Sequence, residues 1–92
     1  MIKSFRDKGL ERFFRKNDPR GIQTLHGSRV ERILSLLDEA SSPEQLGIAG
    51  MFLHHLKGER KSEWAMTVSD NWRITFRYDG EDVIVVNLED YH

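Results

Sequence analysis

The last residues of the chain bring together three side chains that exchange protons. Asp90, Tyr91 and His92 supply a carboxylate, a phenol and an imidazole, directly after the apolar run at residues 83–86. Chain ends fray unless they are tied down, and a buried strand that reaches almost to the last residue would hold these groups in place. The pattern therefore predicts proton-transfer chemistry at this end of the chain.

The other groups that phosphoryl chemistry on RNA requires come from three residues in the middle of the chain. His54, Lys57 and Arg73 add an imidazole, an ammonium group and a guanidinium group. Imidazoles titrate near pKa ~6.5 and suit either direction of proton transfer at neutral pH. Cations stabilise the negative charge that develops on phosphate, so we expect Lys57 and Arg73 to contact phosphate.

The expected reaction needs no metal ion. A base removes the proton from an RNA 2′-hydroxyl, the oxygen attacks the adjacent phosphorus, and an acid protonates the departing 5′-oxygen. The product would be a 2′,3′-cyclic phosphate. We expect the acid to be His92 or Tyr91 and the base to be Asp90 or His54.

The composition argues against thiol and metal chemistry. The chain contains no cysteine, which excludes disulfides, thiolate nucleophiles and cysteine-ligated zinc. His54 and His55 are neighbours, so they would point to opposite faces of a strand, and no compact set of carboxylates and histidines accompanies them in the sequence. We expect neither a metal site nor another cofactor.

Length and hydropathy indicate one soluble domain. With 92 residues and 38% hydrophobic content, residues 1–92 can bury a single core. Residues 1–6 are too interrupted by charge for a signal peptide, and no stretch approaches the length of a membrane span. Together with the lack of cysteine, this predicts a cytoplasmic protein without a membrane partner.

The net charge of −1 conceals a strong asymmetry along the chain. Residues 1–29 carry eight lysines and arginines against three acids, whereas residues 78–92 carry no lysine or arginine and five acids. A basic surface can bind a phosphate backbone without sequence preference, although charge runs are often only solvated surface. The residues expected to contact RNA or the ribosome through this surface are Lys8, Arg12, Arg15 and Lys16.

Hydrophobic periodicity predicts helices first and strands afterwards. Apolar residues at helical spacing predict helices at about residues 5–16 and 28–40, the second one opened by a capping box at Ser28. Ser42 and Pro43 could begin one more short helical turn. Strands are expected near residues 51–56, 64–68, 72–78 and 83–88, with residues 2–4 at the sheet edge.

The strand at residues 72–78 has one apolar face and one polar, largely basic face. Arg73 and Arg77 would lie on the polar face, away from the core and open to substrate. Guanidinium groups match phosphate geometry well, so we expect both arginines to contact RNA. The predicted fold class is α+β, with two N-terminal helices packed on a small, mainly antiparallel sheet.

Several spaced motifs together are more specific than any one of them. They comprise residues 1–5, the His-His-Leu-Lys-Gly segment at 54–58, Trp64, the Asn-Trp-Arg strand at 71–76, and the terminus at 89–92. Over essentially its whole length, the chain resembles the HigB toxins of bacterial toxin–antitoxin systems, within the RelE/ParE superfamily.

The resemblance implies a RelE-like microbial RNase fold and a ribosome-dependent endoribonuclease. Such toxins enter the aminoacyl (A) site of the ribosome and cut the translated messenger RNA. A helix-turn-helix antitoxin, HigA, neutralises them, and the complex represses its own operon. Operator DNA would therefore be contacted only through the antitoxin.

The resemblance also implies roles for single residues and shows two departures. The residues that match positions used at or around the family's RNA site are His54, Lys57, Asn71, Arg73, Asp90, Tyr91 and His92. The family typically has proline where this chain has His55, and many members have arginine where it has Ser69. Because transition-state electrostatics is shared among several donors, we expect slower or differently selective cleavage rather than none.

Two alternatives remain open. A ParE-like DNA gyrase inhibitor would share the fold and the basic surface, but it would not need the proton-transferring terminus. A non-catalytic module that binds antitoxin or RNA would be compatible with Ser69 in place of a cation.

Overall fold

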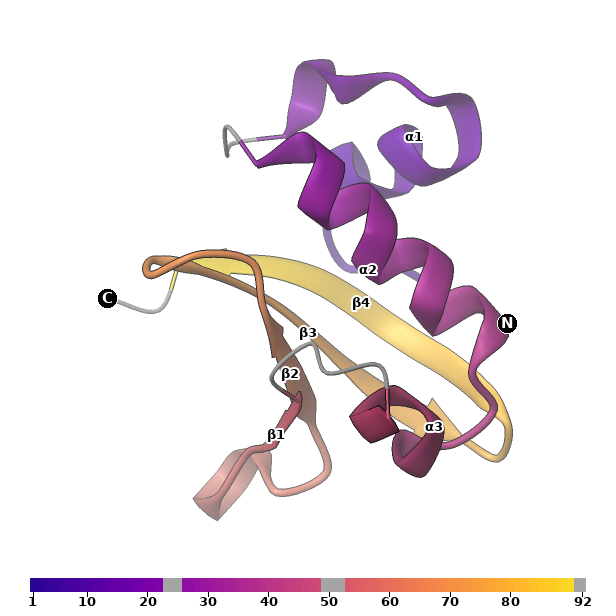
Figure 1. The fold of residues 1–92 in the computed structure, drawn as a ribbon, viewed down its shortest axis with the longest axis vertical. Coiled ribbons are helices and arrows are strands. Elements are labelled where there is room, and N and C mark those ends of the chain that lie inside the picture. The colour runs from indigo at the N-terminus through magenta and orange to yellow at the C-terminus, as the bar shows by residue number, and fades with distance from the viewer. Residues whose placement is uncertain (23–25, 49–52, 91–92) are drawn as a thin grey trace.

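The computed structural model describes residues 1–22, 26–48 and 53–90, and it has an α+β fold (Figure 1). In these ranges the helices α1 (Lys8–Lys16), α2 (Gly27–Glu39) and α3 (Pro43–Ile48) precede the strands. The strands are β1 (Leu53–His55), β2 (Trp64–Thr67), β3 (Trp72–Asp79) and β4 (Asp82–Asp90), and the short 3₁₀ helices are η1 (Pro19–Gly21) and η2 (Gly58–Arg60). The predicted fold class is confirmed, as is the short helix after Ser42.

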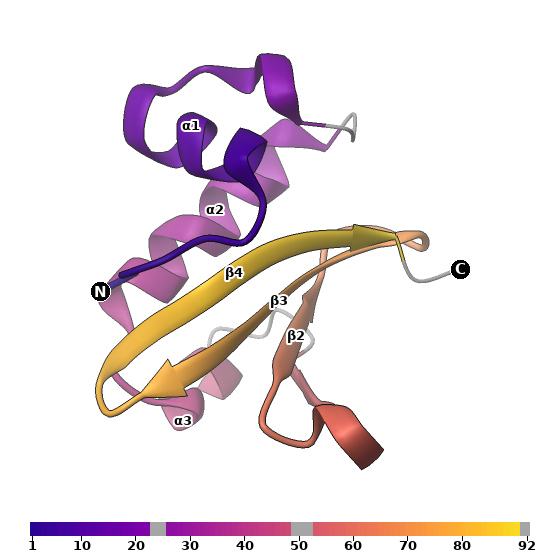
Figure 2. The same cartoon turned by 180° about the vertical axis from the view of Figure 1, so that it is seen from behind.

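The four strands form an antiparallel meander in the order β1-β2-β3-β4. In β3, Ile74 lies between Met66 of β2 and Leu88 of β4. The N-terminal segment runs parallel to β4 at the other edge (Figure 2), where it forms bridges between Ile2 and Val83 and between Phe5 and Val86. The predicted edge segment is therefore present, as two isolated bridges rather than a regular strand.

Helix α1 begins later than the sequence predicted. The predicted start at residue 5 is wrong because Phe5 pairs with Val86, and the N–H of Arg6 donates to the carbonyl of Val86 at 2.8 Å. Asp7 then caps the helix by accepting a hydrogen bond from the N–H of Leu10 at 3.1 Å. The pairing of the extended N-terminal segment with β4 therefore determines where α1 begins.

The capping box predicted for α2 is wrong. Its N-cap is His26, no side-chain hydrogen bond caps the helix there, and Ser28 lies within the first turn. Tertiary packing accounts for the helix instead, since one face of it is almost fully buried. The buried residues of α2 are Val30, Ile33, Leu34 and Leu37.

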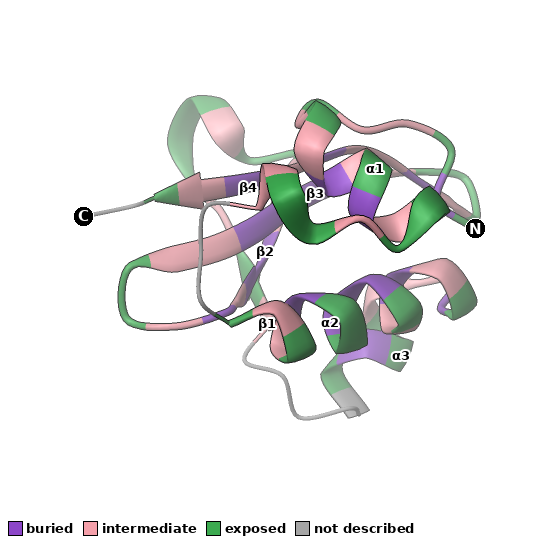
Figure 3. Cartoon of the chain, turned by 90° about the horizontal axis from the view of Figure 1, so that it is seen from above, coloured by how far each residue is buried: buried purple, intermediate pink, exposed green. Residues whose placement is uncertain are grey.

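One cluster of buried side chains joins the helices to the sheet. Figure 3 colours the buried positions of the helices and strands purple. Helix α1 contributes Leu10 and Phe13, and the sheet contributes alternate residues such as Met66, Ile74 and Phe76. The other residues of β3 therefore project to the opposite face, where the polar network described below lies. None of the helices in the described ranges is long and apolar enough to span a membrane.

A bulge interrupts the pairing of β3 with β4. Thr75 pairs with Asn87 but Arg77 pairs with Ile84, so β4 carries one additional residue between these pairs. Val85 in this stretch has φ 50°, an unfavourable conformation for a β-branched residue. Its N–H donates to the hydroxyl of Ser4 at 2.9 Å. The bulge divides the hairpin into two parts, of which only one carries Arg73.

Candidate active site

A groove of about 300 Å³ lies over the first three strands, on the polar face of the sheet. Its lining residues are His54, Leu56, Thr67 and Arg73. Three of them are positioned by strand register, because Thr67 pairs with Arg73, and His54 pairs with Ala65, two positions before Thr67 on β2. Alternation then places His54, Thr67 and Arg73 on one face. The sheet thus brings a predicted proton-transfer group and a predicted phosphate-binding group to one groove.

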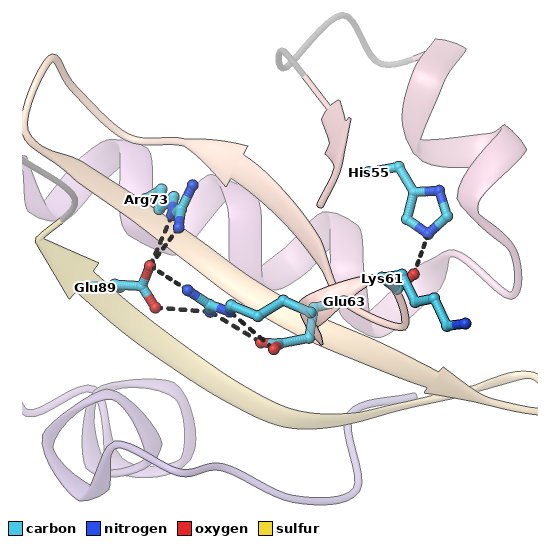
Figure 4. A network of polar contacts seen from close by, with 6 residues as sticks. His55, Lys61, Glu63, Arg73 and Glu89 are labelled. Carbon is cyan, nitrogen blue, oxygen red and sulfur yellow. Dashed lines mark hydrogen bonds and ion pairs between the residues drawn. The ribbon is translucent and has the colours of Figure 1, made fainter. Parts of the chain in front are cut away.

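Arg73 is held by a carboxylate from the neighbouring strand. Glu89 lies directly opposite Arg73 in the register of β3 and β4. Its Oε1 accepts hydrogen bonds from Nε of Arg73 at 2.9 Å and from Nη2 at 2.5 Å (Figure 4). Both side chains are only 21% exposed. The expectation of an open polar face is therefore wrong here, because Glu89 occupies part of it and Thr75 is buried.

Arg60 of η2 extends this ion pair into a network. Its Nη1 and Nη2 donate to the two carboxylate oxygens of Glu89 at 3.0 and 2.8 Å. Its Nε and Nη2 also donate to Glu63 at 2.9 and 3.0 Å. Hydrogen bonds from Arg60 are the main reason that the pKa values of Glu63 and Glu89 lie below the usual range. The two glutamates therefore stay ionised at neutral pH.

His54 and His55 have different surroundings, as their neighbouring positions in the sequence predicted. His54 lines the groove, whereas the ring of His55 stacks on Trp64 with centroids 4.3 Å apart and an interplanar angle of 11°. Nε2 of His55 also lies 2.5 Å from the carbonyl oxygen of Lys61 (Figure 4). A carbonyl only accepts, so Nε2 carries the proton. His55 thus fixes the segment between β1 and β2.

Lys57 is not among the described residues that line the groove. It is exposed and stands at the N-cap of η2, immediately after the groove residue Leu56. Gly58 has φ 69°, a conformation that glycine adopts without strain, so the sharp backbone turn expected there is present. The turn leads directly into the helix that carries Arg60.

The remaining predicted site residues lie at different distances from the groove. Asn71 is exposed in the turn before β3, and Asp90 pairs with Trp72, the residue that follows Asn71. Arg77 is exposed beyond the bulge, about 13 Å along the strand from Arg73. The structure therefore does not bring Arg77 to the groove. Tyr91 and His92 lie outside the described residues.

The basic residues predicted for α1 gather around a second hollow of about 300 Å³. Arg15 donates to Glu11 at 3.0 Å, and its guanidinium carbon lies 5.6 Å from the ring centroid of Phe5. The hollow is lined by Lys8, Glu11, Arg12, Arg15 and Lys16. The four predicted cations thus share one helix surface, separate from the groove at Arg73.

Comparison with known proteins identifies the family of the chain. The family model for the RelE-like toxin of the type II toxin–antitoxin system HigB matches residues 3–92. The chain belongs to this family. A protein from Proteus vulgaris named Endoribonuclease HigB is 40% identical over 92 residues, which is the full length of both chains. The family predicted from the sequence motifs is confirmed.

Membership of this family makes the protein a HigB-like toxin of a type II system, and such a toxin has an antitoxin as its partner. The described residues of the toxin hold no group of three or more histidine, aspartate or glutamate side chains placed to bind a metal ion.

The sequence predictions missed Arg60 and Glu63 as parts of the toxin's candidate site, and they used Glu89 only as part of the terminal motif. Arg60 and Glu63 are three positions apart in the chain, close enough for their opposite charges to pair locally. That local signal could have revealed their pair. Glu89 is 29 positions from Arg60 and 16 from Arg73, and only the register of the hairpin brings it to them.

Proposed function

We propose that this toxin is a ribosome-dependent endoribonuclease that cleaves messenger RNA in the ribosomal A site. The observation that carries the proposal is the presence of His54 and Arg73 in one groove on the polar face of the sheet. An imidazole and a guanidinium group that line one groove suit cleavage of a phosphodiester. The family and the name of the Proteus vulgaris relative support the same activity.

The reaction proceeds by attack of the RNA 2′-hydroxyl on the adjacent phosphorus. His54 or Asp90 removes the hydroxyl proton, and His92 or Tyr91 protonates the departing 5′-oxygen. Arg73, with Lys57 nearby, stabilises the charge on the phosphate oxygens. The bond to the 5′-oxygen breaks as the bond from the 2′-oxygen forms, which leaves a 2′,3′-cyclic phosphate.

The toxin is a single domain that works in the cytoplasm. It has three kinds of partner: the ribosome, messenger RNA and an antitoxin. The basic surface of α1 contacts phosphates of the small ribosomal subunit, and the groove, with Asn71 and Arg77 further along the sheet, contacts the messenger RNA. A HigA-like helix-turn-helix antitoxin neutralises the toxin. Operator DNA is contacted only through that antitoxin.

Mapping RNA 5′ ends after brief induction in bacteria tests the proposal. We expect new 5′ ends inside translated regions within minutes, at positions that follow the reading frame. The matched control is a His54→Ala variant at equal expression, which should give few such ends. A gyrase inhibitor would instead produce broken DNA without frame-dependent RNA ends, and this result would refute the nuclease proposal.

A further inference from the structure

Glu89 is the common partner of two arginines that come from different parts of the chain. It accepts hydrogen bonds from Nε and Nη2 of Arg73 on β3 and from Nη1 and Nη2 of Arg60 on η2. Figure 4 shows the two guanidinium groups converging on this one carboxylate. The position of Arg73 therefore depends on the same side chain as the position of η2.

This arrangement couples the two predicted phosphate-binding cations. Arg60 is the last residue of η2, and Lys57 is its N-cap, so the ion pairs of Arg60 tether the segment that carries Lys57. Glu63 also pairs with Arg60, with its Oε2 2.9 Å from Nε of the arginine. Since Arg73 lines the groove, one carboxylate sets the relative placement of the groove arginine and the lysine-bearing turn.

We infer that Glu89 is a positioning residue for RNA cleavage, acting through Arg73 and Arg60. The inference rests on the proposed nuclease function. Catalysis of phosphoryl transfer depends on the placement of charges, and a displacement of about 1 Å can cost roughly 100-fold in rate. The fork of a guanidinium group paired with a carboxylate provides such placement, because two donors fix the plane of the group.

Two other roles for Glu89 are less compatible with the geometry. An inhibitory carboxylate that gives way to phosphate would have to leave Arg73, but both of its oxygens are also engaged by Arg60. A role in stability alone would not require the partner to be a groove residue. The network consists of two arginines, Arg60 and Arg73, and two glutamates, Glu63 and Glu89, so its charges cancel. It therefore fixes the positions of these groups without adding net charge to the site.

The test is Glu89→Gln in the full-length toxin, which keeps the shape of the side chain and removes its charge. With purified toxin and ribosomes programmed with a defined message, we expect kcat to fall about 10- to 100-fold while KM changes less than threefold. Arg60→Lys keeps the charge but removes the fork, and we expect a similar fall. Thermal melting shows whether each variant is folded under the assay conditions.

Asp18→Asn is the matched control. Asp18 is also a carboxylate paired with a guanidinium fork, at 2.9 and 2.8 Å from Arg20, but it lies at the start of η1 and outside the groove. We expect its kcat to equal that of the wild type. If Glu89→Gln fails to fold, Arg60→Lys still decides the question.

Several results would overturn the inference. The first is a kcat equal to that of the wild type in folded Glu89→Gln or Arg60→Lys. The second is a variant in which KM rises and kcat is unchanged. The third is faster cleavage by Glu89→Gln, which would indicate an inhibitory carboxylate. Each of these leaves the nuclease proposal standing, because the wild type still cuts. If the wild type does not cut the message on ribosomes, the nuclease proposal fails, and this inference fails with it.

Discussion

Arg73 and Glu89 face each other directly across β3 and β4, with Nη2 of Arg73 2.5 Å from Oε1 of Glu89. The arginine expected to stabilise phosphate is thus fixed by a neighbouring carboxylate before any RNA is bound. Its side chain also lines the groove that contains His54. This combination of a fixed cation and a nearby imidazole underlies the predictions that follow.

Replacement of Arg73 by alanine should abolish growth inhibition. Loss of one donor that stabilises charge in the transition state costs roughly 10² to 10³ in kcat. Cleavage on programmed ribosomes and growth after induction measure the effect. Arg20→Ala, at an exposed arginine outside the groove, is the control and should remain toxic. Full toxicity of well-expressed Arg73→Ala would rule out the role assigned to Arg73.

Substitution of the two neighbouring histidines should separate chemistry from stability. His54→Ala should reduce cleavage by roughly 10² to 10⁴ because a general acid or base is lost, with little change in melting temperature. His55→Ala removes the stacking on Trp64 and the hydrogen bond to Lys61, which should cost about 1 kcal/mol of stability. Cleavage rates and urea unfolding of both variants check this. Equal cleavage by wild type and His54→Ala would contradict the assignment.

Removal of Tyr91 and His92 should eliminate most cleavage without unfolding the toxin. Strand β4 ends at Asp90, and its buried residues Val83, Val86 and Leu88 all precede the deletion. We expect the shortened toxin to bind its antitoxin normally, while cleavage falls by roughly 10² to 10⁴. If it poisons cells as well as the full-length toxin does, the acid and base must be sought at His54 and Lys57.

The charge network should make stability depend on pH below neutrality. The pKa of Glu89 is lowered in the folded toxin because Arg60, and also Arg73, donate hydrogen bonds to its ionised form. Such a carboxyl stabilises the fold fully above its unfolded pKa of about 4.3, and this contribution is lost as the pH falls through the lowered value. At pH 7 the free energy of unfolding of the wild type should exceed that of Glu89→Gln by about 1 to 3 kcal/mol.

Urea unfolding from pH 7 down to about pH 3 measures this difference. The gap between wild type and Glu89→Gln should stay constant down to roughly pH 5.5 and shrink at lower pH. Asp18→Asn serves for comparison, because the partner of Asp18, Arg20, is 83% exposed and solvent screens that ion pair, and it should show a smaller gap at pH 7. A gap that grows on acidification would show that Glu89 is not stabilised in its ionised form.

Local patterns predicted most of the elements in this fold. The alternation at residues 72–78 corresponds to β3, and the apolar face at residues 30–37 corresponds to α2, because burial of one face dictates both periodicities. The observed ends differ by a few residues where distant partners intervene. Phe5, predicted to start the first helix, pairs with Val86 instead. No local pattern could indicate a partner so far away in the chain.

The candidate site was predictable in its residue types but not in its connections. His54 and Arg73 line one groove because the strand register places them on one face. Alternation within each strand did not predict that shared face, because the register between strands was unknown. The links from Glu89 to Arg60 and Arg73 span 29 and 16 positions and depend on how the hairpin and η2 pack. Val85 likewise shows no sequence sign of its bulge, because valine is an unfavourable residue for that conformation.

The measurement that tests ribosome-dependent cleavage most directly compares one message in two states. Purified toxin is incubated with the naked messenger RNA and with the same RNA on ribosomes stalled at a defined codon, with Arg73→Ala in parallel. We predict cleavage within the A-site codon on the ribosome and little cleavage of naked RNA, since the ribosome holds the strand in attack geometry. Arg73→Ala should cut neither. Equal rates on free and ribosome-bound message, or no cleavage of either, would contradict the proposed function.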